Sequence, residues 1–435
     1  MTNISVEETA AQGKDWIHRI SPMSAKTFNN VSQLFAKPAL WILLLAAGSL
    51  LLTFANIKFV QAFPGGGQDF LDRWTGARKW LTEGISPYHP DVTALAQQMI
   101  YGRPARPEAG EDLHHFVYPF HSMLFFAPFG LLDFPQARAL WMTVLELAII
   151  GLVVVSTRLI GWEMSAGKSV LLILFSFVWV YGAHTLLVGQ FAGLNALLIA
   201  LVLWNLQYDR DVLAGILLAL TTTKPQMVVL LVPFLMLWAV TTKRWRLIGS
   251  FGITLGVLLG VSLLLLPSWP LEMWRQLTAY PDYAGSISPV EMVGVFFPAL
   301  AGWGTTLAAG LIMLILAWNW WQARTQTGTP FIWTALLTIV VTNLIVPRTT
   351  TSNFMMMLPA FFLGLMTLEQ TLPRWGTWLV ALVLIGLFIG GWVLFFAAFV
   401  EGTMPKHLVF FPFPVICFIG LLWASPQWIR SRSKE

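Results

Sequence analysis

Residues 378–399 read WLVALVLIGLFIGGWVLFFAAF, a run that contains no charged side chain. A helix of about 20 apolar residues crosses the core of a bilayer and satisfies its own backbone hydrogen bonds. Comparable runs occur at residues 38–63, 139–160, 169–188, 194–206, 212–222, 227–240, 247–266, 305–321, 331–346, 354–368 and 409–424. The sequence therefore predicts an all-α, polytopic membrane helical bundle with about 12 transmembrane helices.

The composition also indicates a membrane protein. Of the 435 residues, 57% are hydrophobic and only 11% are charged, whereas a soluble globular protein has about 25% charged residues. Cys417 is the single cysteine, so the chain cannot form an internal disulfide. The net charge of +5 comes from short basic clusters beside the apolar runs and not from one basic stripe, which argues against a nucleic-acid partner.

The basic clusters predict how the chain is oriented in the membrane. They lie in alternate loops, at Arg158 and Lys168, Arg210, Lys243, Arg244 and Arg246, Arg324, Arg374, and Arg430, Arg432 and Lys434. Cytoplasmic loops of membrane proteins are enriched in Lys and Arg. We therefore expect residues 1–37 and 425–435 to form cytoplasmic tails on either side of a membrane domain at residues 38–424, with the whole chain in the cell membrane.

This topology places two long segments on the outer face, at residues 64–138 and 267–303. Within the first, residues 70–81 carry Trp and Leu at helical spacing, which predicts an amphipathic helix on the membrane surface. Residues 118–132 are apolar but reach only about half a crossing, and a full crossing there would turn every later basic loop outward. We expect this stretch to be an interfacial or re-entrant helix, and we expect the chemistry on the outer face.

Asp69 is the first candidate for that chemistry. It follows the glycine run 65–67 after the first apolar run, at the start of the expected helix 70–81. Asp is a favoured N-cap residue of helices, and a positioned carboxylate can also act as a general base. The spacing leaves both roles open, and one residue can fill both.

Two basic residues on the outer face are candidates for binding an anion. Lys224 lies in TTTKPQ, residues 221–226, between two apolar runs, and Arg348 follows the end of another run. A charged side chain deep in a bilayer costs about 3 kcal/mol or more unless it is paired or hydrated, so Lys224 predicts a polar cavity. Phosphate is a natural partner of both cations. Alternatively, Lys224 snorkels to the interface and Arg348 anchors a helix end there.

The remaining polar candidates carry no fixed charge. Gln190 and Asn195 flank a tight turn and can bond sugar hydroxyls or phosphate oxygens, or equally a neighbouring helix. In the first outer segment, Tyr88, Tyr118 and His121 are further candidates for substrate contact. No acid or cysteine stands at ligand spacing from the histidines there, so we expect no metal site. No phosphate-binding glycine loop or dinucleotide motif occurs, so no nucleotide cofactor is expected.

The acid after the first apolar run, the interfacial helix and the inward basic loops resemble the GT-C class of membrane glycosyltransferases. The local strings are similar to glycosyltransferase family 87, which includes the polyprenol-phosphate-mannose-dependent α-1,2-mannosyltransferases of mycobacterial glycolipid synthesis. These strings are GQDF at 67–70 with Ala77, Gly84, Pro87 and Tyr88, YPF at 118–120 with Pro128 and Leu131, ALW at 139–141, Gly189 and Gln190 with Asn195, and Gly215 with KPQ at 224–226. One departure is the pair Asp72-Arg73, where the family usually carries a small apolar-aromatic pair.

The resemblance implies an enzyme that moves mannose or another hexose from a polyprenyl phosphate donor to a glycolipid or glycan acceptor. It implies a single inverting displacement on the extracytoplasmic face, with Asp69 as general base and with Lys224 and Arg348 on the donor phosphate. The residues then expected to bind substrate are Gln190, Asn195, Tyr118, His121 and Tyr88. We expect no metal and no cofactor besides the lipid-linked donor, and membrane lipids as the surrounding partners.

A multi-pass transporter or flippase of a lipid-linked or small polar substrate is the main alternative, because broken helices also suit alternating access. Such a fold often carries a repeat that relates its two halves, and the long segment 64–138 has no counterpart in the second half. A polymerase or ligase that uses lipid diphosphates would usually place its large outer segment late in the chain. The glycosyltransferase interpretation therefore fits the order of the segments better.

Overall fold

The computed structural model describes residues 38–279, 288–346 and 351–432. These residues form α-helices, short 3₁₀-helices and one π-helical turn, and no strand occurs within the described ranges. The chain divides into two compact units, residues 1–55 and residues 56–435. The described part of the first unit is the start of α3 (Pro38–Ala62). The prediction of an all-α fold is confirmed for the described residues.

Within the described residues, six helical stretches are long and apolar enough to cross a membrane. They are Ile42–Ala62 in α3, α7 (Phe134–Ile160), α13 (Trp245–Leu265), α16 (Trp303–Ala323), Thr351–Thr371 across η8 (Thr351–Met357) and α18 (Leu358–Thr371), and Gly376–Val400 across α19 (Gly376–Phe395) and the π-helical turn η9 (Phe396–Val400). The helices α8 (Ala166–Val178) and α9 (Val180–Val188) meet at 59° and together would make a seventh span.

Shorter apolar helices occupy the other predicted runs. They are α10 (Ala192–Gln207), α11 (Asp211–Thr221), α12 (Leu231–Thr241), α17 (Thr329–Ile345) and the first part of α20 (Pro412–Arg432). Each apolar run of the sequence thus contains a helix. The prediction of about 12 crossings is not confirmed, because these helices are shorter than the roughly 20 residues that span a bilayer core.

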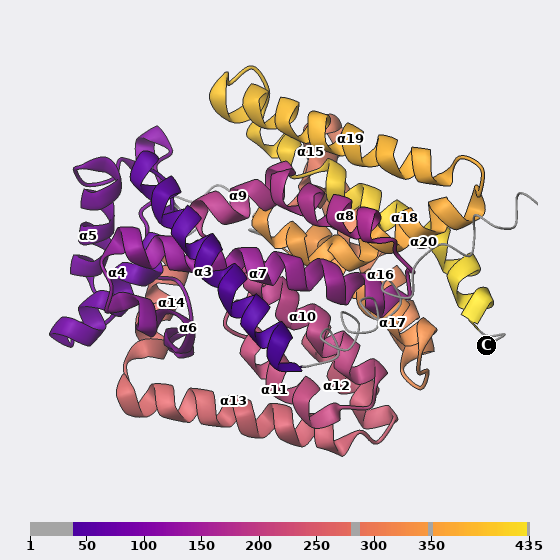
Figure 1. Cartoon of the computed structure of the whole chain (residues 1–435), viewed down its shortest axis with the longest axis horizontal. Helices are drawn as coiled ribbons and strands as arrows, with labels where there is room; N and C mark the ends of the chain where they lie inside the picture. Colours follow the sequence, from indigo (N-terminus) through magenta and orange to yellow (C-terminus); the bar gives the residue numbers. More distant parts are fainter. Residues whose placement is uncertain (1–37, 280–287, 347–350, 433–435) are drawn as a thin grey trace, which may run out of the picture. The chain divides into compact units, whose positions relative to one another are not determined.

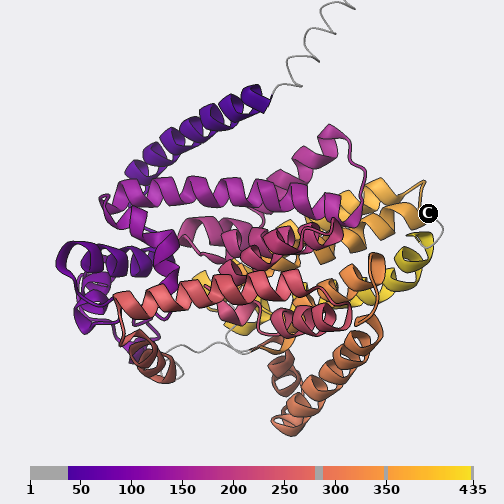
Figure 2. The ribbon, with the colours of Figure 1, turned by 90° about the horizontal axis from the view of Figure 1, so that it is seen from below.

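The main hydrophobic core joins α7, α10, α12, α17, α18 and α20. α17 is buried without interruption from Phe331 to Leu344. A helix that is apolar on all sides packs inside a protein, so its length follows its neighbours rather than the bilayer. α11 contacts both α10 and α13, and the three helices are labelled in Figure 1. Figure 2 shows α13 as the long salmon helix, seen from below.

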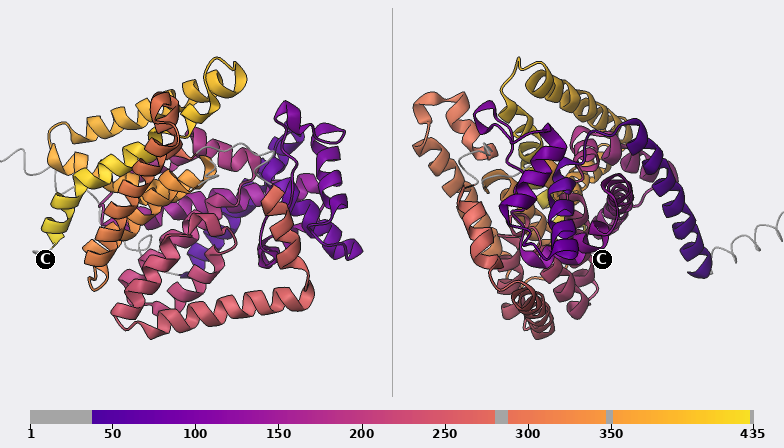
Figure 3. Two further views of the ribbon diagram at one scale, coloured as in Figure 1. Left: turned by 180° about the vertical axis from the view of Figure 1, so that it is seen from behind. Right: turned by 90° about the vertical axis from the view of Figure 1, so that its left-hand side faces the viewer.

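A second core lies where the segment between α3 and α7 folds back on itself. It contains α4 (Gln68–Glu83), α5 (Pro90–Tyr101), η3 (Phe120–Ser122) and α6 (Met123–Gly130), and α14 (Trp269–Ala279) joins them (Figures 1 and 3). The short connecting elements of the chain are η2 (Pro107–Ala109), η4 (Pro225–Met227), η6 (Pro289–Glu291), α15 (Met292–Phe296), η7 (Pro298–Leu300) and η10 (Lys406–Val409).

The two outer helices that the sequence predicts are packed into this second core. The helix expected at residues 70–81 is present in α4, but it is buried on every side from Phe70 to Ala77. The stretch 118–132 forms only η3 and α6, and α6 packs on α4. The first half of α4 is therefore an internal helix of the protein and does not lie flat on a membrane surface.

Candidate active site

The turn before α4 sets the position of Asp69. Gly67 is the N-cap residue of α4, has a φ of 74° and makes no side-chain capping bond. Its N–H donates to the carbonyl of Leu187 at 2.8 Å, which ties the start of α4 to α9. Asp69 therefore lies in the first turn of the helix and is not its cap. Its carboxylate instead accepts a hydrogen bond from Gln190.

Arg138 of α7 also holds the turn before α4 in place through hydrogen bonds. Its Nη1 donates to the carbonyls of Phe63 and Pro64, each at 3.1 Å. A Cβ atom on Gly67 would come within 2.9 Å of Arg138 Cδ. Position 67 thus requires glycine both for its left-handed backbone and for the space that the arginine occupies.

Trp141 of α7 supports both sides of the site. The rings of Phe70 and Phe191 lie 5.3 Å and 6.3 Å from Trp141, each tilted by 8° to the indole plane. The indole N–H donates to the Gly189 carbonyl at 2.8 Å. Phe70 directly follows Asp69, and Phe191 directly follows Gln190. The stack of both rings on Trp141 therefore fixes Asp69 and Gln190 relative to each other.

Replacing Trp141 by alanine is expected to lower stability by about 3–5 kcal/mol, because two stacked rings lose their common partner. Thermal denaturation of the purified protein in detergent measures this loss of stability. Trp141→Phe is the matched control, since it keeps a ring and loses chiefly the indole hydrogen bond, worth about 1 kcal/mol. An alanine variant with the wild-type melting temperature would show that the stack is not needed.

The elements around Asp69 enclose a cavity of about 330 Å³, which falls within the range of about 300–1,000 Å³ for small-molecule sites. The lining comes from α4, from the segment after α5, from the turn after α9, from the break after α11 and from α14. The lining residues are Asp69, Asp72, Arg73, Asp112, His115, Val117, Tyr118, Pro119, Gln190, Thr223, Lys224, Pro225, Gln226, Met273 and Leu277. Charged side chains thus share the cavity with an apolar patch from α14.

Lys224 enters this cavity from the break between α11 and η4, outside the candidate spans. Pro225 follows it and begins the 3₁₀ turn. The lysine is only 2% exposed. Burial lowers the pKa of Lys224 to about 7, although the nearby charge of Asp69 opposes the fall. An anion bound in the cavity would favour the charged ammonium form.

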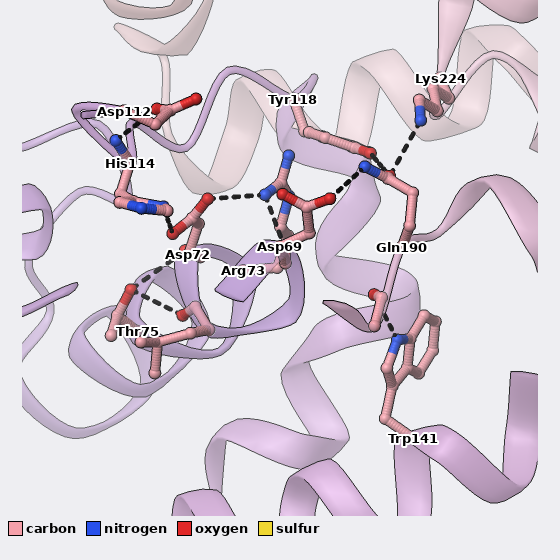
Figure 4. A network of polar contacts seen from close by, with 12 residues as sticks. Asp69, Asp72, Arg73, Thr75, Asp112, His114, Tyr118, Trp141, Gln190 and Lys224 are labelled. Carbon is pink, nitrogen blue, oxygen red and sulfur yellow. Dashed lines mark hydrogen bonds and ion pairs between the residues drawn. The ribbon is translucent and has the colours of Figure 1, made fainter. Parts of the chain in front are cut away.

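Gln190 joins the acid to the cation, as Figure 4 shows. Its Nε2 donates to Asp69 Oδ2 at 2.7 Å, and its Oε1 accepts from Lys224 Nζ at 2.9 Å. The phenol of Tyr118 donates to the same Oε1 at 3.1 Å. The half-buried carboxylate and the buried ammonium therefore contact one amide in one cavity.

A buried ion cluster lies next to Asp69 on α4. Arg73 Nη1 donates to the Asp69 carbonyl at 2.7 Å and to Asp72 Oδ2 at 2.9 Å. The other Asp72 oxygen lies 2.9 Å from His114 Nδ1, and the Arg73 guanidinium lies 4.3 Å above the Tyr118 ring. Burial raises the pKa of Asp72, and the hydrogen bond to His114 and the charges of His114 and Arg73 oppose that rise. The cluster fixes α4 against the segment that carries Tyr118.

Four of the residues predicted from the sequence line the cavity, namely Asp69, Tyr118, Gln190 and Lys224. Arg348, the other predicted phosphate ligand, lies outside the described residues.

Three further predicted residues are described but do not line the cavity. Tyr88 donates its phenol to the Tyr118 carbonyl at 2.5 Å, and so supports a lining residue from behind. His121 Nε2 lies 3.3 Å from the Thr222 hydroxyl. Asn195 is fully buried and its Nδ2 lies 3.5 Å from a methionine sulfur, a contact of the helix-to-helix kind.

Several residues of the cavity were not among the sequence predictions. Arg73 stands one helical turn after Asp69, a spacing that places both on one face of a helix and could have indicated it. Nothing in the spacing relates Asp112, His115 or Thr223 to that face, because they come from loops that only the fold brings together. Among the described residues, no three His, Cys, Asp or Glu side chains are arranged to hold a metal ion.

The arrangement can perform two chemical tasks within one small volume. A carboxylate can accept a proton from a hydroxyl group, and a buried ammonium can stabilise an anionic group. Both tasks are needed when a hydroxyl displaces an anionic leaving group. The apolar patch of Met273 and Leu277 lies in the same lining, so the cavity can also accept an amphiphilic molecule.

Comparison with known proteins assigns the chain to a family. The family model of Glycosyltransferase family 87 matches residues 116–347, just over half of the chain. The matched stretch contains Tyr118, Gln190 and Lys224, whereas Asp69 precedes it.

The curated relatives include the alpha-(1->3)-arabinofuranosyltransferases of two Mycobacterium tuberculosis strains, CDC 1551 / Oshkosh and ATCC 25618 / H37Rv. Each is 26% identical to this chain over 283 residues, which is 61% of this chain and 62% of the relative. The chain thus spans less than two thirds of the length of these relatives. No solved structure matches it. With its helical membrane fold and its match to the family model, the chain belongs to glycosyltransferase family 87.

Proposed function

We propose that this glycosyltransferase moves a sugar from a polyprenyl phosphate donor to a glycolipid or glycan acceptor with inversion at the anomeric carbon. Asp69 is the general base, and Lys224 contacts the donor phosphate. Arg348, which lies outside the described residues, is the second proposed phosphate ligand on the strength of its sequence position. The observation that carries the proposal is that Asp69 and Lys224 line the same cavity.

The proposed reaction is one displacement. Asp69 accepts the proton of the acceptor hydroxyl while the hydroxyl oxygen forms a bond to the anomeric carbon. The bond between that carbon and the phosphate oxygen breaks, and its electron pair stays on the polyprenyl phosphate. Lys224 stabilises the negative charge that develops there. Asp69 then loses its proton to solvent, which restores the base.

The proposal includes an extracytoplasmic site with both termini in the cytoplasm. The basic loops support this orientation, because Lys and Arg are enriched on the cytoplasmic side. The donor sugar is a hexose such as mannose or, by comparison with relatives named arabinofuranosyltransferases, an arabinofuranose. A lipid-linked donor is consistent with the absence of nucleotide-binding motifs in the sequence.

A panel of radiolabelled donors tests the proposal. Purified protein in lipid nanodiscs is incubated with polyprenyl phosphates that carry mannose, glucose, galactose or arabinofuranose, together with extracted membrane glycolipids as acceptors. We expect transfer from a polyprenyl phosphate sugar and a product of opposite anomeric configuration. Sugar nucleotides serve as control donors. Transfer from sugar nucleotides alone, or retention of configuration, would overturn the proposal.

The proposed contact between Lys224 and the donor phosphate predicts a pH dependence. A phosphonate analogue of the donor carries one constant negative charge, and it binds best while Lys224 is protonated. The pKa of Lys224 in the empty site is about 7, so the lysine is mostly protonated at pH 6 and mostly neutral at pH 8. We expect the dissociation constant to rise about tenfold from pH 6 to pH 8. Lys224→Arg stays charged throughout and should show a flat profile. A flat wild-type profile would place the phosphate elsewhere.

A further inference from the structure

The side-chain amide of Gln190 is held in place by hydrogen bonds to other residues of the protein. Its side chain is 5% exposed, and its amide has three protein partners in the described structure, Asp69, Lys224 and Tyr118 (Figure 4). The Trp141 indole N–H donates to the carbonyl of Gly189, the residue before Gln190, and so holds the turn that carries the amide. Both ends of the amide are thus occupied by protein.

The chemistry of the partners fixes which way the amide points. An ionised carboxylate only accepts hydrogen bonds, and an ammonium only donates them. Burial raises the pKa of Tyr118 to about 12, so its phenol also remains a donor at neutral pH. Only one orientation satisfies all three, with Nε2 toward Asp69 and Oε1 toward Lys224 and Tyr118. Rotating the amide by half a turn would set donor against donor and acceptor against acceptor.

The amide also stands where an ion pair would otherwise form. Among the described residues, Asp72 forms ion pairs with Arg73 and His114, but no ion pair joins Asp69 to Lys224. A direct pair would stabilise the ionised carboxylate and so weaken it as a base. It would also neutralise the cation that the donor phosphate needs. Gln190 contacts both groups and carries no charge, so it keeps each charge available.

We propose that Gln190 is a positioning residue that acts as a neutral spacer, holding the Asp69 carboxylate and the Lys224 ammonium in one cavity without letting them pair. This inference rests on the proposed function for the roles of the two charged groups. It differs from the substrate contact that the sequence predicts for Gln190, because its amide is committed to the protein. Within the described residues only Oδ2 of Asp69 is engaged by a side chain, which leaves Oδ1 for the acceptor hydroxyl.

Other titratable groups surround Asp69 and belong to the electrostatic background of any pH experiment. They are Asp72 and Arg73 on α4, Asp112, His114, His115 and Tyr118 from the segment after α5, His184 on α9 and Lys224 after α11. All of these groups are retained in the variants of Gln190. A change in the pH profile therefore measures the effect of replacing the neutral amide at position 190.

The first test compares pH–rate profiles of Gln190→Glu and Gln190→Met with wild type. The added carboxylate of Gln190→Glu should raise the acid limb of kcat/KM by about one pH unit or more, because like charges raise a carboxyl pKa. Gln190→Met lets the ammonium approach Asp69, so its acid limb should move down by a similar amount. Tyr118→Phe is the control and should leave the limb in place. If both Gln190 variants change only the acceptor KM, Gln190 is a substrate contact and the proposal is wrong.

The second test needs no turnover and so separates this inference from the proposed function. Binding of a polyprenyl methyl phosphate, a diester that keeps one negative charge throughout, to the nanodisc-embedded protein is measured from pH 6 to pH 10. We expect the introduced carboxylate of Gln190→Glu, and the Asp69 carboxylate in Gln190→Met, to lie against Lys224. The pH at which binding is half lost should therefore rise by about one unit or more in both variants. Unchanged midpoints would overturn the spacer even if transfer is observed. If a variant is unstable on size exclusion, Gln190→Asn replaces it, since the shorter amide cannot reach both charges.

A wild-type protein that transfers no sugar from any lipid-linked donor would refute the proposed function alone. The binding midpoints would still decide whether Gln190 separates the two charges. Conversely, normal transfer with unshifted limbs and midpoints would leave the proposed function standing and remove the spacer.

Discussion

Asp69→Asn is expected to lower the transfer rate by about 10²- to 10⁴-fold, the contribution of a positioned general base. The variant should fold normally, because the amide oxygen of asparagine can still accept the hydrogen bond from Gln190 that Asp69 Oδ2 accepts in the wild type. The turn before it is set by Gly67 and Arg138 and does not depend on the carboxylate. The measurement is kcat for the donor that the panel identifies, together with the melting temperature.

The control for Asp69→Asn is the same substitution at a neighbouring aspartate. Asp72→Asn removes a carboxylate of the same cavity that is already held by Arg73 and His114. Its chief effect should be on the melting temperature, since buried charges lose their partner. An Asp69→Asn protein that transfers sugar at the wild-type rate would remove Asp69 from the mechanism.

Lys224→Met is expected to be the second severe variant. Removal of a group that stabilises a developing negative charge costs about 10²- to 10³-fold in rate, and the donor KM should rise as well. The melting temperature should stay the same or increase, because an apolar side chain of similar length replaces a charge that is 2% exposed. Gln190 Oε1 keeps the Tyr118 phenol as a donor in this variant.

Lys224→Arg is the matched variant for this position. It retains the positive charge and should lose less activity than Lys224→Met. The two variants are compared by kcat and donor KM in the same nanodiscs. If Lys224→Met kept the wild-type rate and donor KM, the lysine would serve only to hold Gln190 in place.

The sequence was sufficient to place a helix in each apolar run and to name four residues that line the cavity, Asp69, Tyr118, Gln190 and Lys224. Apolar runs and their breaks mark helices well, because a helix must satisfy its backbone within the run. Lys224 could be predicted because a lysine between two apolar runs is costly unless it faces a polar cavity. Asp69 could be placed near a helix start, although the cap belongs to Gly67.

The parts that could not be predicted depend on packing between distant segments. The 11-residue helices α11 and α12 are too short to span a bilayer alone, and only the fold shows which neighbours cover them. The burial of α4 follows from aromatic partners on α6 and α7, such as Phe129 and Trp141 around Phe70. The link from Asp69 through Gln190 to Lys224 joins three segments whose separation in sequence gives no sign of contact.

The most direct measurement is a cryo-EM structure of the protein in a nanodisc with the non-cleavable phosphonate analogue of the identified donor. The account predicts density for the phosphonate within hydrogen-bond distance of Lys224 Nζ, and the anomeric carbon of the sugar facing the side of the cavity that carries the Asp69 carboxylate. A phosphonate bound away from Lys224, or a sugar separated from Asp69 by packed side chains, would contradict it.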